Sequence, residues 1–457
     1  MMTEEKESGK FIEKFIDFAS ALGNQIYLRS LRDAFATIMP VFIVAGIAVL
    51  INNIIFPLFL SGDALLSAQV WGNLLTNGTL SISGLLIAAA IGYRLARNMD
   101  YENPFMGAVI SVSVLIIMMP TVISATPFGA TDSDAVVKVT GALAYSNLGT
   151  SGMFAGIIIG LLATDIFIRL TKIEKLKIKM PEMVPPAVAD SFNALIPVII
   201  IFCIFGALAA MLNVFAATDL VNLIKYWIAE PLKSVNASLP GVCLLYTLGN
   251  LLFCFGIHQS VITGSLLDPF MIANINENML AFANHQAIPN ILCSPLVNNF
   301  GLIGGSGDTL CLIIATFIFS KYKASRSISE LSLAPGLFNI NEPVIFGYPI
   351  VFNIALIIPF VLMPTLGIII GYYTTLWGWM NPSIVFTPWT TPPLLAPYLA
   401  TGGDWRAVVI QLFVIILGVF VYLPFMKLSE RIQMRSAGIE EKEEAAETGE
   451  AGKAAAE

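Results

Sequence analysis

The chain has few charged residues. Of its 457 residues, only 12% are Asp, Glu, Lys or Arg, whereas 56% are hydrophobic, and the mean hydropathy is +0.80. An ordinary soluble domain has about a quarter of its residues charged. This shortage of charge excludes an ordinary soluble domain and predicts an integral membrane protein built of apolar helices.

Cysteine and histidine are also scarce. The five cysteines are odd in number and scattered through apolar segments, which does not fit a disulfide framework. The two histidines, His258 and His285, could be drawn with Cys254 and Cys293 as a metal site, but their spacing matches no zinc pattern. We therefore expect buried thiols, no metal and no cofactor.

The N-terminal segment shows no targeting signal. It begins MMTEEKESGK and lacks the basic region, apolar core and cleavage site of a signal peptide, so we expect none to be removed. Residues 11–22 place apolar side chains on one face, which predicts an amphipathic helix on the membrane surface within residues 1–30. The net charge of −7 comes mostly from the acidic ends and argues against nucleic acid as a partner.

Basic residues predict the membrane topology. They gather in five clusters, and cytoplasmic loops carry an excess of Lys and Arg. If all five are cytoplasmic, an even number of spans separates each cluster from the next. The interval 180–320 has three clear apolar segments, so a weaker fourth span is expected within 262–299. This gives about ten spans with both termini in the cytoplasm. The clusters are Arg29 and Arg32, Arg94 and Arg97, Arg169 to Lys179, Lys321 to Arg326, and Lys427 to Arg435.

The predicted fold class is an all-α integral membrane protein with about ten transmembrane helices and re-entrant hairpins. Two Pro-rich apolar pieces, 332–349 and 380–400, are too short to cross and are expected to be re-entrant. The first half of the chain is regular and the second irregular, which predicts an N-terminal membrane half at 31–185 and a C-terminal membrane half at 186–427. Residues 428–457, rich in Glu and Ala, are expected to be a disordered cytoplasmic tail.

Glu342 is the first candidate for chemistry. It is the last charged residue before Asp404, so residues 343–403 contain no Asp, Glu, Lys, Arg or His. Ionisable groups at membrane depth are costly and usually functional. Asn339 and Asn341 flank it and could hold a carboxylate or a sugar hydroxyl. Pro343 suits the first position of a helix, where a missing N–H costs nothing.

Other polar residues stand out in apolar surroundings. His258 lies in the apolar run 234–267, where a functional role is favoured over a structural one, whereas His285 fits a structural or loop position. Trp389 in FTPWTTPP could be a platform for a sugar ring, with hydroxyls such as that of Thr391 beside it, or simply a membrane-interface residue. The segment GGSGD at 304–308 lacks the Lys of a phosphate loop and predicts a helix break or a close helix contact.

These motifs together resemble a known family. GLFNINEPVIFGYPIVFN, with FGIH upstream and PWTTPP and TGGDW downstream, is similar to the membrane-embedded enzyme IIC of the bacterial sugar phosphotransferase system, in its lactose, cellobiose and diacetylchitobiose branch. LRDAFATIMPVFIVAG and MPEMVPPAVADSFNALIP extend the resemblance over nearly the whole chain.

The resemblance implies a function. Such proteins are homodimers in the bacterial inner membrane, in which the first half forms the dimer contact and the second half carries a β-linked disaccharide in an elevator-like motion. A phosphorylated enzyme IIB then donates phosphate from a cysteine to the 6-hydroxyl of the sugar. Carried over to this sequence, Glu342 and His258 are the catalytic groups near that hydroxyl. The further substrate-binding candidates are Asp190, Asn250, Asn339, Asn341, Trp389 and Thr391.

Two features leave alternatives open. Asp190 stands where many relatives carry Asn, which puts the choice of substrate in doubt. The residues after Lys427 contain neither Cys nor His, so we expect the IIB donor to be a separate protein. The alternative function is a proton-coupled secondary transporter, in which Glu342 would carry a proton and the sugar would leave unmodified. The residues alone, without the resemblance, do not exclude it.

Overall fold

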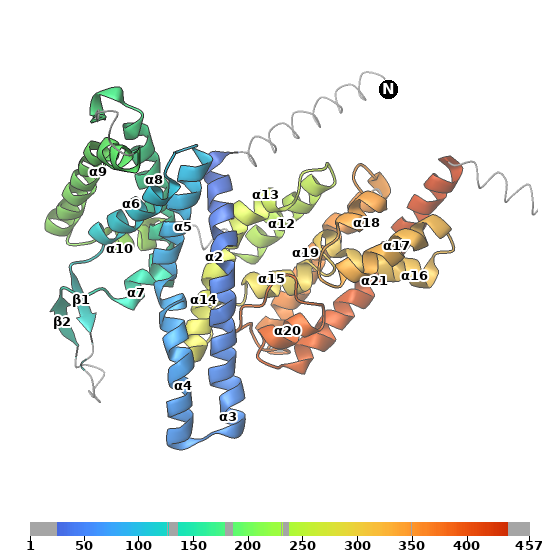
Figure 1. Cartoon of the computed structure of the whole chain (residues 1–457). Coiled ribbons are helices and arrows are strands. Elements are labelled where there is room, and N and C mark those ends of the chain that lie inside the picture. The colour runs from blue at the N-terminus through green and yellow to red at the C-terminus, as the bar shows by residue number, and fades with distance from the viewer. Residues whose placement is uncertain are drawn as a thin grey trace, which may run out of the picture. The chain divides into compact units, whose positions relative to one another are not determined.

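The computed structural model describes residues 25–125, 127, 136–178, 186–229, 231, 237–348 and 350–436 (Figure 1). The chain divides into two compact units. The N-terminal unit contains the described residues within 21–238 and 264–289, and the C-terminal unit contains those within 239–263 and 290–457. The boundary thus falls later in the chain than the division at 185/186 expected from the sequence. The amphipathic helix expected at 11–22 lies outside the described residues.

The N-terminal unit is a stack of apolar helices. Helix α5 packs against α2, α6 and α8, while α9 packs on α6 and α8, and α14 packs on α2. Buried Ile87, Ile91 and Leu95 recur along α5 at helical spacing, which explains how one helix face fills the core. The elements are α2 (Ile26–Leu50), η1 (Ile51–Ile55), α3 (Phe56–Phe59), α4 (Gly62–Asn77), η2 (Leu80–Ile82), α5 (Ser83–Asn98), α6 (Pro104–Ile117), β1 (Val122–Ala125), β2 (Val137–Thr140), α7 (Tyr145–Leu148), α8 (Thr150–Thr171), η3 (Glu174–Leu176), α9 (Pro186–Ala216), α10 (Leu220–Ile224), η4 (Lys225–Ala229) and α14 (Asp268–Ala283).

A short β-hairpin in this unit was not expected from the sequence. Strands β1 and β2 pair antiparallel, with Val122 opposite Thr140 and Ala125 opposite Val137. The β-branched residues of VKVT favour a strand, but four residues are too few for the alternating pattern to be distinguished from a loop.

The C-terminal unit is more irregular. Helices α19 and α21 pack together, and α12, α15 and α16 pack on one or the other of them. The elements are α12 (Leu239–Phe253), α13 (Ser260–Ile262), α15 (Ser294–Gly301), η6 (Ser306–Asp308), α16 (Thr309–Phe319), α17 (Lys323–Gly336), α18 (Glu342–Gly347), α19 (Ile354–Leu376), α20 (Leu395–Ala400) and α21 (Trp405–Ser436). The π-helical turn η5 (Thr263–Leu267) connects α13 to α14.

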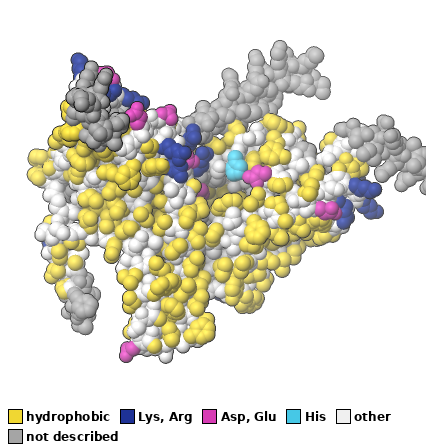
Figure 2. Space-filling model, viewed as in Figure 1, with side chains coloured by type: hydrophobic (Ala, Val, Ile, Leu, Met, Phe, Trp, Pro, Cys, Tyr) yellow, Lys and Arg dark blue, Asp and Glu magenta, His cyan; other side chains and the backbone are white. Residues whose placement is uncertain are grey.

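The helices confirm the predicted class of membrane protein. Within the described residues, seven helices are long and apolar enough to cross a membrane, and α6 and α12 are shorter apolar helices. In their described residues, the two segments expected to be re-entrant contain only α18, α20 and the end of α17 as helices, joined by irregular backbone. Figure 2 shows hydrophobic side chains over much of the visible surface, as expected where helices face lipid.

The end of α21 corrects the expected tail. Residues 428–436, assigned to the disordered tail, are helical, and residues 437–457 lie outside the described residues. Two polar side chains of this stretch are buried. The Ser320 hydroxyl donates to Oε1 of Glu430 at 2.5 Å, and Nδ2 of Asn353 donates to Oγ of Ser429 at 2.9 Å. These contacts extend the helix beyond the apolar run because they pair its polar groups.

Candidate functional site

A break separates α15 from α16 in the C-terminal unit, as the glycine cluster at 304–308 predicts. The carboxylate of Asp308 accepts a hydrogen bond from the backbone N–H of Ile303 at 2.7 Å. The hydroxyl of Thr309 donates to the carbonyl of Gly304 at 2.6 Å, and that of Tyr422 donates to the carbonyl of Gly307 at 2.5 Å. The residues with positive φ are Gly304 (77°), Gly305 (98°), Gly307 (75°) and Asp308 (54°).

Three candidate amides attach to this break. The N–H of Gly307 donates to Oδ1 of Asn250 at 3.1 Å, and the N–H of Gly304 donates to Oδ1 of Asn339 at 2.8 Å. Nδ2 of Asn341 donates to the carbonyl of Ser306 at 2.7 Å. The three side chains are buried, with at most 8% of their surface exposed. They therefore satisfy backbone groups that a broken helix leaves unpaired.

The same amides connect other segments to the break. Asn250 is on α12 and also donates from Nδ2 to the carbonyl of Tyr246 at 3.0 Å. Nδ2 of Asn339 donates to the carbonyl of Trp389 at 2.5 Å, which fixes the 386–393 loop. In this arrangement the three amides act on protein backbone, and their role as sugar ligands stays a prediction.

Trp389 and Thr391 lie in that loop. The Trp389 side chain is partly exposed, with 39% of the residue surface accessible, so its ring is available for stacking. The Thr391 hydroxyl donates to the carbonyl of Pro388 at 2.8 Å, which closes a tight turn. Asp190 lies in α9, and its side chain is outside the described part of the structure.

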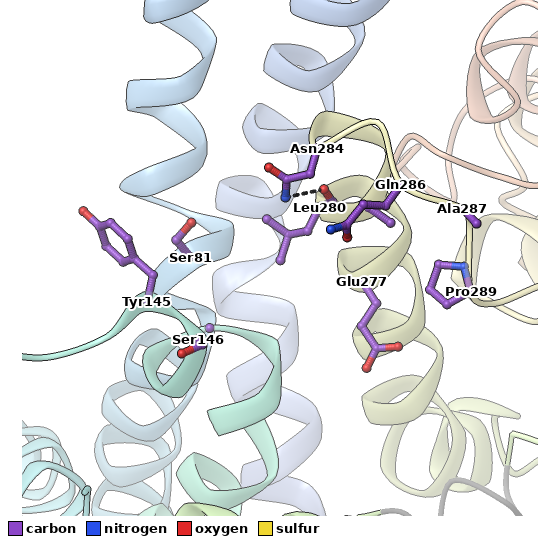
Figure 3. Close-up of a pocket in the computed structure, with 11 residues that line it drawn as sticks. Ser81, Tyr145, Ser146, Glu277, Leu280, Asn284, Gln286, Ala287 and Pro289 are labelled. Carbon is purple, nitrogen blue, oxygen red and sulfur yellow. Dashed lines mark hydrogen bonds between the residues drawn. The ribbon is translucent and has the colours of Figure 1, made fainter. Parts of the chain in front are cut away.

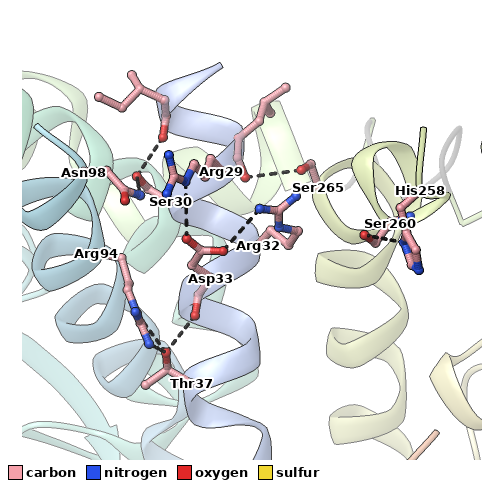
Figure 4. Close-up of polar contacts among 12 residues, drawn as sticks. Arg29, Ser30, Arg32, Asp33, Thr37, Arg94, Asn98, His258, Ser260 and Ser265 are labelled. Carbon is pink, nitrogen blue, oxygen red and sulfur yellow. Dashed lines mark hydrogen bonds and ion pairs between the residues drawn. The ribbon is translucent and has the colours of Figure 1, made fainter. Parts of the chain in front are cut away.

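The loop that carries His258 runs from the end of α12 to the start of α13. Its ring is exposed and lies 4.7 Å from the ring of Phe253. The backbone N–H of Ser260 donates to Nδ1 of His258 at 3.2 Å, and Oγ of Ser260 lies 2.9 Å from the same nitrogen (Figure 4). Ser260 is not among the residues expected from the sequence, although its position two residues after the histidine was a usable signal.

Glu342 begins α18, a helix of six residues. Its side chain is exposed, and Asn341 at the N-cap has its amide bonded to the break. Pro343 is the second residue of this helix rather than the first, a position that also needs no intrahelical N–H donor. The acid therefore stands on a short helix whose start is fixed to the buried break.

The segments of His258 and Glu342 meet beyond the end of α18. The N–H of Phe352 donates to the carbonyl of Cys254 at 2.9 Å, and the rings of Phe255 and Phe352 lie 6.1 Å apart. The His258 loop is therefore packed against the chain that follows the Glu342 helix. This places the two candidate catalytic residues on neighbouring segments of one unit.

This part of the C-terminal unit is near its basic end. Asn353, next to Phe352, bonds Ser429 close to the cluster that starts at Lys427. The guanidinium of Arg326 donates to the carbonyl of Ser320, which in turn is bonded through its hydroxyl to α21. The two basic clusters of this unit thus lie at one end, as the predicted topology requires.

Basic residues of the N-terminal unit also share one end. The Arg94 guanidinium donates to the Thr37 hydroxyl at 2.6 Å, and Asn98 donates to the Ser30 hydroxyl at 2.8 Å, so the end of α5 lies beside the start of α2 (Figure 4). Arg169 at the end of α8 donates to the Tyr27 hydroxyl at 3.2 Å. Three basic clusters therefore meet at this end.

A pocket with several polar lining residues lies in the N-terminal unit, beside the first residues of α5 and α8 and away from the basic clusters at their last residues. It has a volume of about 500 Å³ and is lined by Ser81, Tyr145, Ser146, Glu277, Asn284 and other residues (Figure 3). Nδ2 of Asn284 donates to the carbonyl of Leu280 at 2.9 Å. The pocket provides a second carboxylate, that of Glu277, with which Glu342 can be compared.

A second cavity, in the C-terminal unit, is apolar. It has a volume of about 530 Å³ and is lined by Tyr373, Trp377, Trp379, Phe413 and aliphatic side chains. Aromatic residues at helix ends are typical of the membrane–water interface. This cavity therefore fits contact with lipid better than contact with a sugar.

Comparisons with known proteins show the family of the chain. Residues 32–364 match the family model "Phosphotransferase system, EIIC". The chain is 32% identical over 428 residues to the PTS system oligo-beta-mannoside-specific EIIC component of Bacillus subtilis, covering 93% of this chain and 94% of that protein. It is 30% identical to the cellobiose-specific EIIC component of Lactococcus lactis, covering 93% and 98% of the two chains.

A solved structure gives the same result. The crystal structure of ChbC, the IIC component of the N,N'-diacetylchitobiose-specific phosphotransferase system, matches with a TM-score of 0.85 at 30% identity. The match covers 94% of this chain and 99% of that one. The sequence resemblance is thereby confirmed, and the chain belongs to the EIIC family of the phosphotransferase system.

Proposed function

We propose that the chain is the membrane permease subunit that takes up a β-linked disaccharide of the cellobiose, diacetylchitobiose or lactose type and presents its 6-hydroxyl for phosphorylation. Family membership supports the general role, and the names of the relatives support the class of sugar. The observation that carries the proposal is the packing of the His258 loop against the segment after the Glu342 helix, near the basic end of the C-terminal unit.

The proposed reaction needs little covalent work from this chain. The 6-oxygen attacks the phosphorus of a phosphocysteine on enzyme IIB, an O–P bond forms, and the S–P bond breaks with the electron pair on the cysteine sulfur. The hydroxyl proton passes to the carboxylate of Glu342. His258 orients the hydroxyl or shares its proton. Positioning and charge stabilisation dominate phosphoryl transfer, so two exposed groups on a fixed scaffold are sufficient.

Enzyme IIB is the proposed protein partner. A relative from Staphylococcus haemolyticus is named a lactose-specific EIICB component, and the alignment covers 92% of this chain but 70% of that protein. A IIB part joined to a IIC part in one chain supports a role for IIB beside the IIC surface. The basic clusters near Lys321 and Lys427 support a donor side in the cytoplasm, with both termini proposed to lie on that side of the bacterial cell membrane.

The transport step is proposed to be elevator-like in a homodimer. The N-terminal unit is a close helical stack suited to a fixed dimer contact, and the C-terminal unit contains every sugar-site candidate except Asp190, most of them on irregular backbone. Irregular backbone at membrane depth is compatible with a cavity that moves between the two sides.

The test is chemical. Purified protein in lipid vesicles is given radiolabelled cellobiose, diacetylchitobiose or lactose, with phosphorylated or unphosphorylated IIB. We expect sugar 6-phosphate only with phosphorylated IIB, and the strongest product formation identifies the preferred sugar. Accumulation of unmodified sugar under a proton gradient, without phosphorylated IIB, would overturn the proposal in favour of the proton-coupled transporter.

A further inference from the structure

The hydrogen-bond donor that faces Nδ1 of His258 determines the tautomer of the ring. The backbone N–H of Ser260, 3.2 Å away, can only donate. This contact favours Nδ1 as the accepting nitrogen, and a neutral imidazole then carries its hydrogen on Nε2. The Ser260 hydroxyl, 2.9 Å from Nδ1, can rotate to donate to the same nitrogen.

The local backbone explains why this contact forms. Ser260 is the first residue of α13, and first-turn N–H groups have no intrahelical acceptor. The imidazole supplies that acceptor, while the carbonyl of His258 accepts from the N–H of Val261 at 3.1 Å. The Phe253 ring beside the imidazole, tilted by 49°, restricts its plane. Both the orientation and the protonation pattern of the ring are thus set by the loop.

We propose that Ser260 is a positioning residue that holds His258 as a hydrogen-bond donor through Nε2–H. This inference rests on the proposed function and assigns the proton transfer within it. His258 donates to a lone pair of the 6-oxygen, whose own hydrogen points at the Glu342 carboxylate, and the remaining lone pair attacks phosphorus. The proton leaves to Glu342, and the imidazole begins and ends the step neutral.

The alternative, in which His258 accepts the proton, meets a geometric obstacle. A ring with hydrogen on Nε2 can take a second proton only at Nδ1. That proton would face the N–H of Ser260, which would lose its acceptor, and only the Ser260 hydroxyl, 2.9 Å from Nδ1, could accept it. The contact between His258 and Ser260 therefore divides the roles: the Glu342 carboxylate accepts the proton, and the His258 imidazole donates a hydrogen bond.

The small number of histidines makes the tautomer directly measurable. The chain has two, and His285 is exposed with a φ of 55°, a conformation that Asn also adopts readily. His285→Asn therefore leaves His258 as the single histidine. With ¹⁵N-labelled histidine, one-bond N–H couplings and nitrogen shifts of the full-length protein in lipid, recorded at alkaline pH, identify which nitrogen carries hydrogen. We expect the Nε2–H form alone.

Substitutions of Ser260 test the positioning role. Ser260→Ala removes the hydroxyl, so the His258 ring keeps only its contact with the backbone N–H of residue 260 and is held less firmly. Ser260→Thr keeps a hydroxyl. We expect Ser260→Ala to lower kcat for sugar phosphorylation about 10-fold to 100-fold, as a misplaced catalytic group does, with sugar Kd changed less than about 2-fold, and Ser260→Thr to restore most of the rate.

The outcomes separate the inference from the function on which it rests. Hydrogen on Nδ1, or a rapid average of the two tautomers, would overturn the assignment of His258 as donor. An unchanged kcat in Ser260→Ala would overturn the positioning role. Absence of sugar phosphate from the unmodified protein with phosphorylated IIB would instead contradict the proposed function, and the nitrogen spectrum would still report the tautomer.

Discussion

The two units of the chain use glycine and polar side chains in opposite ways. In the N-terminal unit, Gly92 of α5 and Gly107 of α6 lie so close that a Cβ on either would collide with the carbonyl of the other. Both belong to regular helices. In the C-terminal unit, glycines such as Gly307 have positive φ and break a helix, and buried amides such as that of Asn250 bind the freed backbone.

This difference separates the N-terminal unit, here called the packing unit, from the C-terminal unit, here called the site-bearing unit. Helices in lipid associate through small residues that permit close backbone approach, and this needs no polar partner. Irregular backbone in a membrane needs every N–H and C=O paired inside the protein. The C-terminal unit meets that need with side chains from α12 and the 339–341 segment. As a result, Glu342 and His258 are exposed while their neighbours are fixed.

The largest difference between the two units is expected when the Glu342 carboxylate of the C-terminal unit is neutralised. We expect Glu342→Gln to lower the rate of sugar phosphorylation by about 10²-fold to 10⁴-fold, the usual value of a general base, while sugar binding persists. The matched control is Glu277→Gln in the polar pocket of the packing unit (Figure 3), which should leave the phosphorylation rate within about 3-fold.

The measurement is sugar phosphate formed at saturating sugar, together with equilibrium binding. Equal losses in Glu342→Gln and Glu277→Gln would show that the site is not confined to the C-terminal unit. Normal phosphorylation in Glu342→Gln would refute its role as the proton acceptor.

Glycine substitutions test the structural half of the comparison. Gly307→Ala places a side chain at a φ of 75° and drives its Cβ into the ring of Phe360. We expect a loss of about 2–4 kcal/mol in the free energy of unfolding, from left-handed strain and overpacking together. Gly206→Ala, in α9 with open space around its Cβ, is the control and should change stability by less than about 1 kcal/mol.

Thermal unfolding of the detergent-solubilised protein measures both variants. A Gly307→Ala protein as stable as Gly206→Ala would mean that the break tolerates a side chain, and the distinction between the two uses of glycine would fail.

The sequence predicts local features of the site well. The density of glycine at 304–308 predicts the break, because positive φ is inexpensive only for glycine. Pro343 marks the start of α18, which the structure confirms, whereas the isolated charge of Glu342 before a long uncharged run makes that residue a functional candidate. These signals lie within a few residues of the feature that they predict.

Contacts between distant segments could not be predicted in this way. Asn250 and Asn341 are sugar-ligand candidates in sequence, and the backbone groups of the break that they bind lie 57 and 35 residues away. Glu430 looks like part of a solvated tail because its partner, Ser320, is 110 residues distant. A local pattern shows that a polar group is present, and only the fold shows which group satisfies it.

A smaller effect is expected from the aromatic platform. Trp389→Ala should weaken sugar binding about 10-fold, which corresponds to about 1.4 kcal/mol, because a stacked ring loses its apolar face. Trp377→Ala is the control within the same unit, since Trp377 belongs to the aromatic group with Tyr373 and Trp379. Isothermal titration with the preferred sugar measures both. A larger loss in Trp377→Ala would move the sugar site to the apolar cavity.

The smallest effect concerns the ion pair that holds the start of α21. Burial raises the pKa of the Asp404 carboxyl, but hydrogen bonds from Arg406 and from the backbone N–H groups of Asn381 and Arg406 outweigh it, so the pKa lies below the ordinary value. A lowered folded-state pKa contributes stability that is complete above the ordinary aspartate pKa of about 3.9 and is lost as the pH falls through the lowered value.

We expect the unmodified protein to lose this contribution during acid titration and Asp404→Asn to lack it already at neutral pH. The two free energies of unfolding should differ at neutral pH by about 1 kcal/mol or less, because the Arg406 side chain is 42% exposed and its charge is screened by solvent. Unfolding of both proteins between pH 3 and pH 7 is the measurement. The difference between their stabilities should shrink toward the acid end. Stability curves of the two proteins that stay parallel over the whole pH range would show that the backbone alone fixes the start of α21. The charge of Asp404 would then make no contribution to stability.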